Sequence, residues 1–307
     1  MEHIIEKYLI ETAVNQNLSS HTMKAYRIDL TQLARFMKNL KISDVGFIQK
    51  EHLNEYIQSL KINYKVKTIK RKIVSSKKFF AYLLNEKYIS SNPFNSIKLK
   101  LKSDITIPKT ISFHDMKKLY EKVYTNYNNS GINPIYSLTE VLIIELLYTT
   151  GIRVSELCNI KKSDLNLKSK TILINGKGRK ERIVFINSID TTCLIKKYIK
   201  LTSHSNSEYL LKNDEMKQIS TQSVRLRIKR LSNEANIKSN ITPHMFRHTF
   251  ATSLLEEEIN LMYIQDLLGH SSLNTTQIYI TINKKKQQRL INRKHPRNRI
   301  ITSYSKG

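Results

Sequence analysis

Apolar residues recur every three to four positions through the first hundred residues of the chain, which is the period of an amphipathic helix. The pattern predicts four helices, at Glu2 to about Val14, Met23 to Met37 behind the capping residues Ser19 to Thr22, Glu51 to Leu60, and Thr68 to Leu84. Asn92-Pro93 ends this region, and the stretch that follows has no helical period. We therefore expect a helical domain over residues 1–97 and a basic linker over residues 98–111.

The remaining residues, 112–307, predict a second domain that is also mainly helical. An apolar helix is expected from Thr139 to Tyr148, with Gly151 after it in the left-handed conformation that often ends helices. A short helix is expected to open just beyond Arg153. Further helices are expected at about residues 221–236, 243–257, 260–268 and 274–290.

A β-hairpin is expected between these helices. Two β-rich runs, Thr171–Ile174 and Arg182–Ile186, flank Gly176-Lys177-Gly178, which places Lys177 at or near the turn. Residues Glu208 to Leu211 are a further candidate strand. The predicted fold class is thus mainly α with a small β-hairpin or sheet, an α+β arrangement in two domains.

Length and composition are those of a globular chain. Its 307 residues suit two domains better than one, and 40% of them are apolar. The chain has no run of about 18 apolar residues, so no membrane span is expected, and the first residues lack the pattern of a secretory signal. The two cysteines, Cys158 and Cys193, indicate neither a disulfide framework nor a metal site. We expect a cytoplasmic protein.

The net charge of +27 makes a polyanion the natural partner, because each neutralised phosphate releases condensed counterions. A lysine-rich composition alone would raise the charge, but it does not explain clustering: residues 61–78 hold eight Lys or Arg and no acid. Nine Lys or Arg, and no acid, follow Asp266. The basic run is read as DNA contact, with solvated surface as the alternative. The candidate DNA-contact residues are Lys24, Arg27, Lys67, Lys70, Arg71 and Lys77.

Two arginines are candidates for holding a phosphate. His244 and Arg247 lie three apart on one face of a predicted helix that begins at Thr242-Pro243. The planar guanidinium can bind two phosphate oxygens at once. Arg153 and Arg247 come from different segments and could clamp a scissile phosphate from two sides, stabilising the charge of its pentavalent transition state.

The remaining roles follow from proton demands. A tyrosine hydroxyl with a pKa near 10 is a weak nucleophile until a base or a cationic pocket assists it. We expect Tyr279 to attack, His244 to act as base, and Lys177 to donate a proton to the leaving 5′ oxygen. His270 would hydrogen-bond the phosphate. Because the bond energy stays in a phosphotyrosyl link, no metal, ATP or other cofactor is needed.

The order of these residues resembles the tyrosine recombinase or phage integrase family, in particular its Xer-type bacterial subgroup. The motifs that carry the resemblance are Thr22-Met23-Lys24-Ala25-Tyr26, Gly151-Ile152-Arg153-Val154-Ser155-Glu156-Leu157, Gly176-Lys177-Gly178-Arg179-Lys180-Glu181-Arg182, Thr242-Pro243-His244-Met245-Phe246-Arg247-His248, the run from Leu267 through Leu268-Gly269-His270 to Tyr279, and His295-Pro296-Arg297. The resemblance covers nearly the whole chain. It implies an amino-terminal four-helix SAM-like core-binding domain, or DNA clamp, and a carboxyl-terminal tyrosine-recombinase catalytic domain.

The same resemblance implies a site and a set of partners. The active-site residues would be Arg153, Lys177, His244, Arg247, His270 and the nucleophile Tyr279, which carries the 3′-phosphate of DNA. The family forms a homo- or hetero-tetramer, often with a second recombinase, on two DNA duplexes and exchanges strands through a Holliday junction. Xer-type members resolve chromosome dimers at cell division, controlled by a septal DNA translocase. The tail after Lys284 would pack on a neighbouring protomer.

Several positions depart from the usual Xer pattern. Ile280-Thr281 follows the tyrosine where Thr-His is more common, and the stretch Tyr124 to Ser137 is longer than expected. Ser137-Leu138-Thr139-Glu140 lacks the customary Arg-Asp entry to its helix. These differences leave a mobile-element integrase open as an alternative. A catalytically silent DNA-binding architectural protein and a topoisomerase with type IB-like chemistry are the other candidate functions.

Single residues also have simpler readings. Arg153 alone could be a structural arginine paired with Glu156, and Lys177 alone an ordinary turn residue. His244 and His248 lie four apart, but no third zinc ligand is near them in the sequence. We therefore expect His248, and likewise Glu156 and Asp266, to be structural. The joint match in order and spacing is what favours the catalytic reading.

Overall fold

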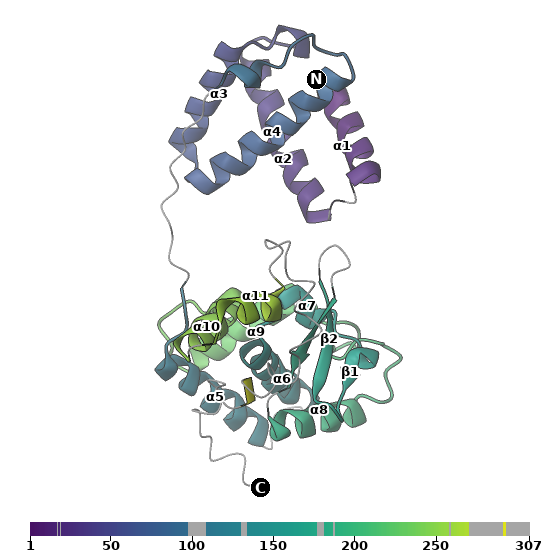
Figure 1. Ribbon diagram of the computed structural model, residues 1–307, viewed down its shortest axis with the longest axis vertical. Helices are drawn as coiled ribbons and strands as arrows, with labels where there is room; N and C mark the ends of the chain where they lie inside the picture. The colour runs from purple at the N-terminus through teal and green to yellow at the C-terminus, as the bar shows by residue number, and fades with distance from the viewer. Residues whose placement is uncertain are drawn as a thin grey trace. The chain divides into compact units, whose positions relative to one another are not determined.

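A computed structural model describes residues 1–16, 18, 20–97, 109–129, 134–176, 181–186, 188–257, 259–269 and 291–292. The chain divides into two compact units, Met1–Thr106 and Ile107–Gly307 (Figure 1). Helices dominate both units, and the described strands form one three-stranded sheet in the second unit. The predicted fold class is confirmed. Among the described residues, no helix has both the length and the apolar character to cross a membrane.

The first unit contains the four helices that the sequence predicts. They are α1 (Glu2–Gln16), α2 (Ser20–Asn39), α3 (Lys50–Asn63) and α4 (Val66–Asn85). Their apolar stripes meet in one core, in which Leu30, Leu33, Phe79 and Phe80 have no exposed surface. A 3₁₀ turn, Pro93–Ser96, follows; the Asn92 side chain caps it by accepting from the Phe94 N–H at 2.9 Å.

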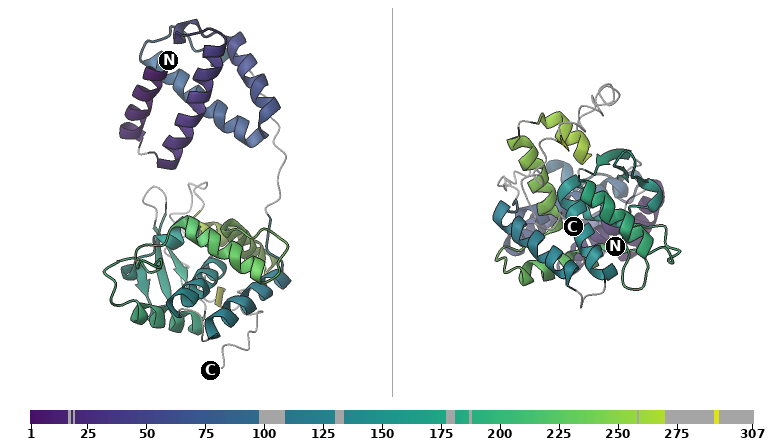
Figure 2. Two further views of the ribbon diagram at one scale, coloured as in Figure 1. Left: turned by 180° about the vertical axis from the view of Figure 1, so that it is seen from behind. Right: turned by 90° about the horizontal axis from the view of Figure 1, so that it is seen from below.

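The second unit is built around one buried helix. Its helices are α5 (Phe113–Asn128), α6 (Pro134–Thr150), α7 (Val154–Cys158), α8 (Ile189–Leu201), α9 (Thr221–Glu234), α10 (Pro243–Glu256) and α11 (Leu261–Leu268). Every residue of α6 from Ser137 to Thr150 is buried, because α5, α8 and α10 pack around it (Figure 2). The buried Glu145 carboxylate accepts from the Tyr124 hydroxyl at 2.7 Å and the Thr191 hydroxyl at 3.2 Å.

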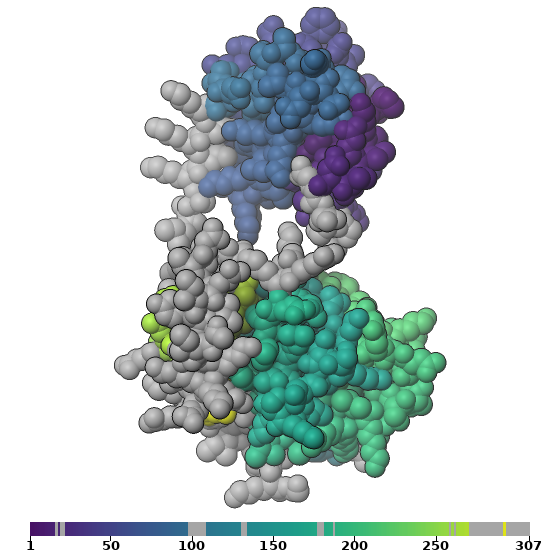
Figure 3. All heavy atoms as spheres, turned by 45° about the vertical axis from the view of Figure 1, so that its right-hand side comes forward, coloured from purple at the N-terminus to yellow at the C-terminus, as the bar shows by residue number. Residues whose placement is uncertain are grey.

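The small sheet has the order β1-β2-β3, with both pairs antiparallel. Its strands are β1 (Leu165–Asn166), β2 (Thr171–Asn175) and β3 (Glu181–Phe185). The β2–β3 pair is the predicted hairpin, in which Ile172 faces Val184 and Asn175 faces Glu181 across the ladder. Residues 177–180 between the two strands, which include Lys177, lie outside the described residues. The described atoms of the sheet, α8 and the segment toward α9 form a continuous body, teal to green in Figure 3.

The candidate strand at Glu208 to Leu211 is not a strand. Tyr209 forms a single bridge with Lys161, while Ile219 donates its N–H to the Leu211 carbonyl at 3.2 Å. The backbone of this short run thus has partners in two different segments, so no continuous ladder forms. The helix expected at about residues 274–290 lies outside the described residues.

Helix α11 is attached to the second unit through a small apolar cluster of its own. Most of its buried members come from α10, α11 and the end of β3. They are Phe185, Phe250, Leu254, Ile264, Leu267 and Leu268, together with Ile259 and Ile291 from outside these elements. This cluster fixes the carboxyl end of α11 beside β3 and α10. The residues of the candidate site meet at that end of the helix.

Candidate functional site

Gly151 positions the first arginine of the site. Helix α6 ends at Thr150, and Gly151 takes a φ of +63° that an L side chain rarely adopts. A Cβ atom here would lie 2.3 Å from the Phe250 ring of α10, so the position also requires the absence of a side chain. The predicted left-handed end of this helix is confirmed. Arg153 follows two residues later as the N-cap residue of α7.

Helix α10 supplies His244 and Arg247. Pro243 occupies its first turn, and Thr242 is the residue at its cap. The Thr242 side chain makes no capping hydrogen bond; its carbonyl instead accepts from the Met245 N–H at 2.9 Å. His244 is exposed, whereas Arg247, one turn further on, is only 6% exposed. The same helix therefore presents a surface imidazole and a buried guanidinium.

Three arginines from three different segments each donate to a carbonyl at the carboxyl end of α11. The contacts are Arg182 Nε to Leu267 O at 2.7 Å, Arg247 Nη2 to Leu268 O at 2.5 Å, and Arg153 Nη2 to Gly269 O at 3.5 Å. Carbonyls in the last turn of a helix lack partners within the helix and carry partial negative charge. We call Arg153, Arg182 and Arg247 the arginine cluster.

Glu156 is shared by two members of the cluster. Its Oε1 accepts from Arg153 Nη1 at 2.7 Å and from Arg182 Nη1 at 3.0 Å. Its Oε2 accepts from the Arg153 backbone N–H at 2.8 Å and from Arg182 Nη2 at 2.7 Å. Burial alone would raise the pKa of Glu156, but hydrogen bonds from Arg182 and Arg153 outweigh burial and lower the pKa to about 2. The carboxylate is therefore ionised at neutral pH.

Arg247 is the member of the cluster without a carboxylate partner among the residues described. Among the described residues, its guanidinium donates to two backbone oxygens, at 3.0 Å to Gly151 O and 2.5 Å to Leu268 O. Burial, followed by the charge of Arg153, lowers the pKa of Arg247 to about 10. With three guanidinium groups against the single carboxylate of Glu156, the described part of the site has a net positive charge. Such a site favours an anion.

The surroundings of His244 also oppose positive charge. Partial desolvation lowers its pKa below the usual value, and the charges of His248, Arg225, Arg247 and Arg153 lower it further. The imidazole is therefore neutral at neutral pH and has a nitrogen free of a proton, as a base requires. His248 is exposed on the next turn. No group of three potential metal ligands occurs among the described side chains.

The structure thus describes half of the predicted catalytic residues. Arg153 and Arg247 donate to neighbouring carbonyls at the end of α11, and both lie close enough to His244 for their charges to affect its pKa. The other predicted catalytic residues, which lie outside the described residues, are Lys177, His270 and Tyr279. In sequence, Lys177 falls in the turn between β2 and β3, and His270 directly follows Gly269 of the site.

The candidate DNA-contact residues of the first unit differ in how far they are available. Arg71 forms an ion pair with the buried Asp29, and Arg27 forms one with Glu6. Both arginines retain exposed surface beyond these pairs. The exposed lysines of the set are Lys24, Lys67 and Lys77, and Lys70 is half-buried. Neighbouring Lys72 is not a surface residue: it is 3% exposed, with its Nζ 2.9 Å from Asp29 Oδ1.

The sequence alone assigns no functional role to Arg182 or Glu156. Arg182 is the last residue of the Gly176 to Arg182 motif, and Glu156 is expected to be structural. Their side chains are 10% and 5% exposed and form a bidentate ion pair inside the site. The available signal was an arginine in the apolar run Arg182–Ile186, where a buried charge must have a partner.

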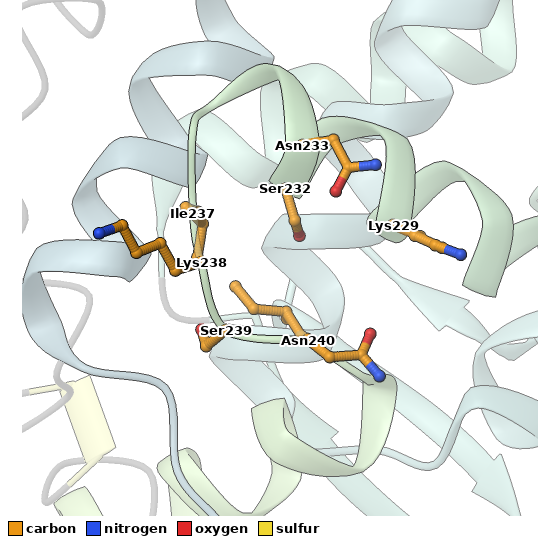
Figure 4. A pocket seen from close by; sticks show the side chains of 8 residues that line it. Lys229, Ser232, Asn233, Ile237, Lys238, Ser239 and Asn240 are labelled. Carbon is orange, nitrogen blue, oxygen red and sulfur yellow. The ribbon is translucent and has the colours of Figure 1, made fainter.

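A pocket of about 250 Å³ lies elsewhere, between the end of α9 and the segment that leads to α10 (Figure 4). Its lining residues are Lys229, Ser232, Asn233, Ile237, Lys238, Ser239, Asn240 and Ile241. None of these is a predicted catalytic residue, and none is a carboxylate or a histidine. The pocket therefore contains none of the side chains that the sequence predicts to be catalytic.

Comparison with known proteins gives a family match for each of the two units. Residues 109–286 match the phage integrase family, and residues 5–87 match the phage integrase N-terminal SAM-like domain. A tyrosine recombinase of Agathobacter rectalis is 41% identical over 302 residues, which cover 95% of this chain and 96% of that protein. The tyrosine recombinase XerD of Staphylococcus saprophyticus is 35% identical over 304 residues, covering 97% and 100%.

Solved structures share the fold. The XerH site-specific recombinase bound to a palindromic difH substrate, in a post-cleavage complex, has a TM-score of 0.73 at 22% identity and covers 94% of this chain and 83% of its own. A lambda integrase dimer bound to a COC′ core site has a TM-score of 0.67 at 19% identity, with 89% and 95% covered. At these identities the likeness concerns the fold alone.

Proposed function

The chain belongs to the phage integrase family of tyrosine recombinases, and on that premise we propose that it is a site-specific recombinase that cuts and rejoins double-stranded DNA. The observation that carries the proposal is Arg247, a buried guanidinium whose described partners are backbone oxygens alone. It adjoins Arg153, whose side chain is 36% exposed and can be reached by a ligand. The phosphate of a phosphodiester carries the negative charge that two neighbouring guanidinium groups bind well.

Arg153 and Arg247 stabilise the negative charge of the phosphate. A guanidinium has five N–H donors in a rigid fork, and Arg247 uses its two Nη atoms on carbonyls that a phosphate oxygen can replace or join. In the pentavalent transition state the phosphate gains negative charge. Two fixed guanidinium groups, Arg153 and Arg247, stabilise that state more than the ground state, which is the requirement for catalysis.

The proton steps balance around the phosphorus. The Tyr279 oxygen forms a bond to the phosphorus as the bond to the 5′ oxygen breaks, which leaves a 3′-phosphotyrosyl ester. His244 accepts the phenol proton, Lys177 donates a proton to the 5′ oxygen, and His270 donates a hydrogen bond to the phosphate. The reverse reaction with a different 5′ end rejoins the strands. Because the ester keeps the bond energy, the cycle uses no metal and no ATP.

In this proposal the two domains have different functions. Residues 1–97 act as a DNA clamp, residues 98–111 as a basic linker, and residues 112–307 as the catalytic domain. The enzyme acts in the cytoplasm as a tetramer on two duplexes, through a Holliday junction, with itself or a second recombinase. A lambda integrase tetramer bound to a Holliday junction, with a TM-score of 0.65 at 18% identity, supports the fold required for this assembly.

For the biological role we propose resolution of chromosome dimers at cell division, under a septal DNA translocase. Relatives named XerD that match the chain over their whole length support the Xer-type assignment. A mobile-element integrase is the alternative. An adduct assay on the chromosomal dimer-resolution site of the source organism, compared with the ends of its mobile elements, separates the two roles.

The decisive experiment on the activity traps the covalent intermediate. The full chain is incubated in EDTA and without ATP with a pool of nicked duplexes of randomised sequence. The nick is used because cleavage beside it releases a short fragment, and loss of that fragment prevents resealing. We expect a protein–DNA adduct that survives denaturation, and protease digestion followed by sequencing then identifies the site. If the chain retains duplexes from the pool but forms no adduct, the proposal fails and a silent architectural protein is favoured.

The rate of cleavage is expected to depend on pH through His244. The neutral imidazole is the active form, and its pKa lies below the usual 6.5, so the rate should hold below pH 6.5 and fall only at lower pH. His248→Gln removes one of the positive neighbours and should move this fall to higher pH, toward the usual value. Single-turnover rates measured from about pH 4.5 to about pH 8, on both sides of the usual histidine pKa, test the pH dependence of the unaltered chain and of the variant. A fall centred above 6.5 in the unaltered chain would rule out His244 as this base.

A further inference from the structure

We propose that Arg182 is a positioning residue of the cleavage site, which holds Arg153 in place through Glu156 and does not bind the scissile phosphate itself. The inference rests on the proposed function, because it assigns a role within that site. It adds to the predicted catalytic set a residue whose guanidinium nitrogens each donate to Glu156 or to the Leu267 carbonyl.

The contacts of Arg182 engage every nitrogen of its guanidinium. Nη1 and Nη2 meet Oε1 and Oε2 of Glu156 at 3.0 and 2.7 Å, and Nε donates to Leu267 O at 2.7 Å. Each of its three nitrogens therefore has an acceptor in the protein, and the side chain is 10% exposed. This distinguishes it from Arg247, whose acceptors are neutral carbonyls, and from Arg153, which is more exposed.

Glu156 transmits the constraint to Arg153. Both carboxylate oxygens that Arg182 holds also accept from Arg153, one from its Nη1 and one from its backbone N–H. An arginine side chain that is 36% exposed has many rotamers, and a fixed carboxylate selects among them. With Arg182 removed, Glu156 keeps its contacts to Arg153 but loses the partner that fixes its own position.

Arg182 also ties this pair to the place where the chain leaves α11. Gly269 has a φ of +64°, and a Cβ atom there would lie 3.2 Å from both Cδ and Nη1 of Arg182. The Arg182 side chain thus passes against the backbone of the residue that directly precedes His270. One side chain links β3, α7 and the end of α11, the three segments beside which Lys177, Arg153 and His270 occur in the sequence.

A buried ion pair could instead serve the fold alone, and a matched control separates the two cases. Arg227 of α9 is also buried, with its side chain 7% exposed and its Nη2 3.0 Å from Asp214 Oδ1. Its recorded hydrogen bonds, to Asp214 and Tyr136, involve none of the arginine cluster. Arg227→Gln therefore measures what the loss of a buried arginine costs without any change at the site.

The experiment compares Arg182→Lys, Arg182→Gln, Glu156→Gln and the double variant Arg182→Gln/Glu156→Gln with Arg227→Gln. Single-turnover cleavage of a nicked duplex, DNA affinity and the folded fraction are measured for each full chain. We expect both Arg182 variants to slow cleavage about 10- to 100-fold, since small misplacement of a catalytic group has effects of that size. DNA affinity should change by less than about threefold, because binding is spread over many phosphates. Arg227→Gln should show neither effect.

The double variant tests the route of the effect. If Arg182 acts through Glu156, the double variant should be no slower than the slower of the two single variants, whereas independent effects would multiply. Cleavage by Arg182→Gln at the rate of Arg227→Gln, after correction for folded fraction, would overturn the proposal, as would multiplying effects. If Arg182→Gln does not fold, Arg182→Lys, which keeps the charge but not the fork, decides alone. Failure of the unaltered chain to form an adduct would count against the proposed function instead.

Discussion

Replacing Tyr279 with phenylalanine is expected to abolish the covalent protein–DNA adduct and to leave DNA binding in place. The change removes one hydroxyl, which is the proposed nucleophile, while the arginines that hold the phosphate remain. Loss of a nucleophile cannot be offset by the other groups of a site, so cleavage should slow by at least about 10⁴-fold. Denaturing electrophoresis of the nicked-duplex reaction measures the adduct, and a binding assay on the same duplex measures affinity.

The control for this change is Tyr263→Phe, a tyrosine of α11 that packs on the apolar cluster next to the site. It should form the adduct at a rate close to that of the unaltered chain. An adduct that persists in Tyr279→Phe, with DNA attached to another residue by peptide mapping, would contradict the assignment. Mixing Tyr279→Phe with an arginine-deficient variant adds a second result: recovered adduct would mean that one protomer supplies the tyrosine to the arginines of another.

Much of the helical framework follows from the sequence because local signals and tertiary packing agree there. The four helices of the first unit have clear apolar stripes, and each extends only a few residues beyond its predicted bounds. Gly151 and Pro243 set a helix end and a helix start because their backbone geometry leaves few alternatives. The hairpin follows from two β-rich runs on either side of glycines.

Other elements depend on partners that are distant in the sequence. Strand β1 is two residues long and exists because β2 lies beside it. Helix α8, Ile189–Leu201, directly follows the β-rich run and was not predicted, although Ser188 caps it by accepting from the Asp190 N–H at 3.1 Å. The run at Glu208 to Leu211 has the composition of a strand but no partner strand, which is information that a local pattern lacks.

The candidate site shows the same division. The order and spacing of Arg153, His244 and Arg247 identify them without any geometry, because the chemistry requires those residue types. The convergence of three guanidinium groups on the last carbonyls of α11 cannot be predicted that way, since it depends on the approach of β3, α7 and α10. For the same reason Arg182 was overlooked: its partners Glu156 and Leu267 are 26 and 85 residues away.

Replacing Arg247 with methionine is expected to stop cleavage with little loss of thermal stability. The guanidinium is 6% exposed, has only carbonyl acceptors among the described residues, and has a pKa lowered to about 10 by burial. A buried guanidinium that is not hydrogen-bonded to a carboxylate opposes folding, so its removal offsets the loss of two hydrogen bonds from a charged donor, worth about 2 kcal/mol each. Cleavage should fall by about 10³-fold or more, because a fixed donor to the transition-state phosphate is lost.

Replacing Arg182 with methionine should, in contrast, lower the stability of the folded protein markedly. Arg182→Met leaves the buried Glu156 with Arg153 as its described partner, and breaking a buried ion pair lowers the free energy of unfolding by about 3 kcal/mol. Denaturant unfolding of both variants without DNA, under identical conditions, compares the two costs. If Arg247→Met lost as much stability as Arg182→Met, Arg247 would be held in place for the fold. Its buried charge would then no longer argue for a phosphate at the end of α11.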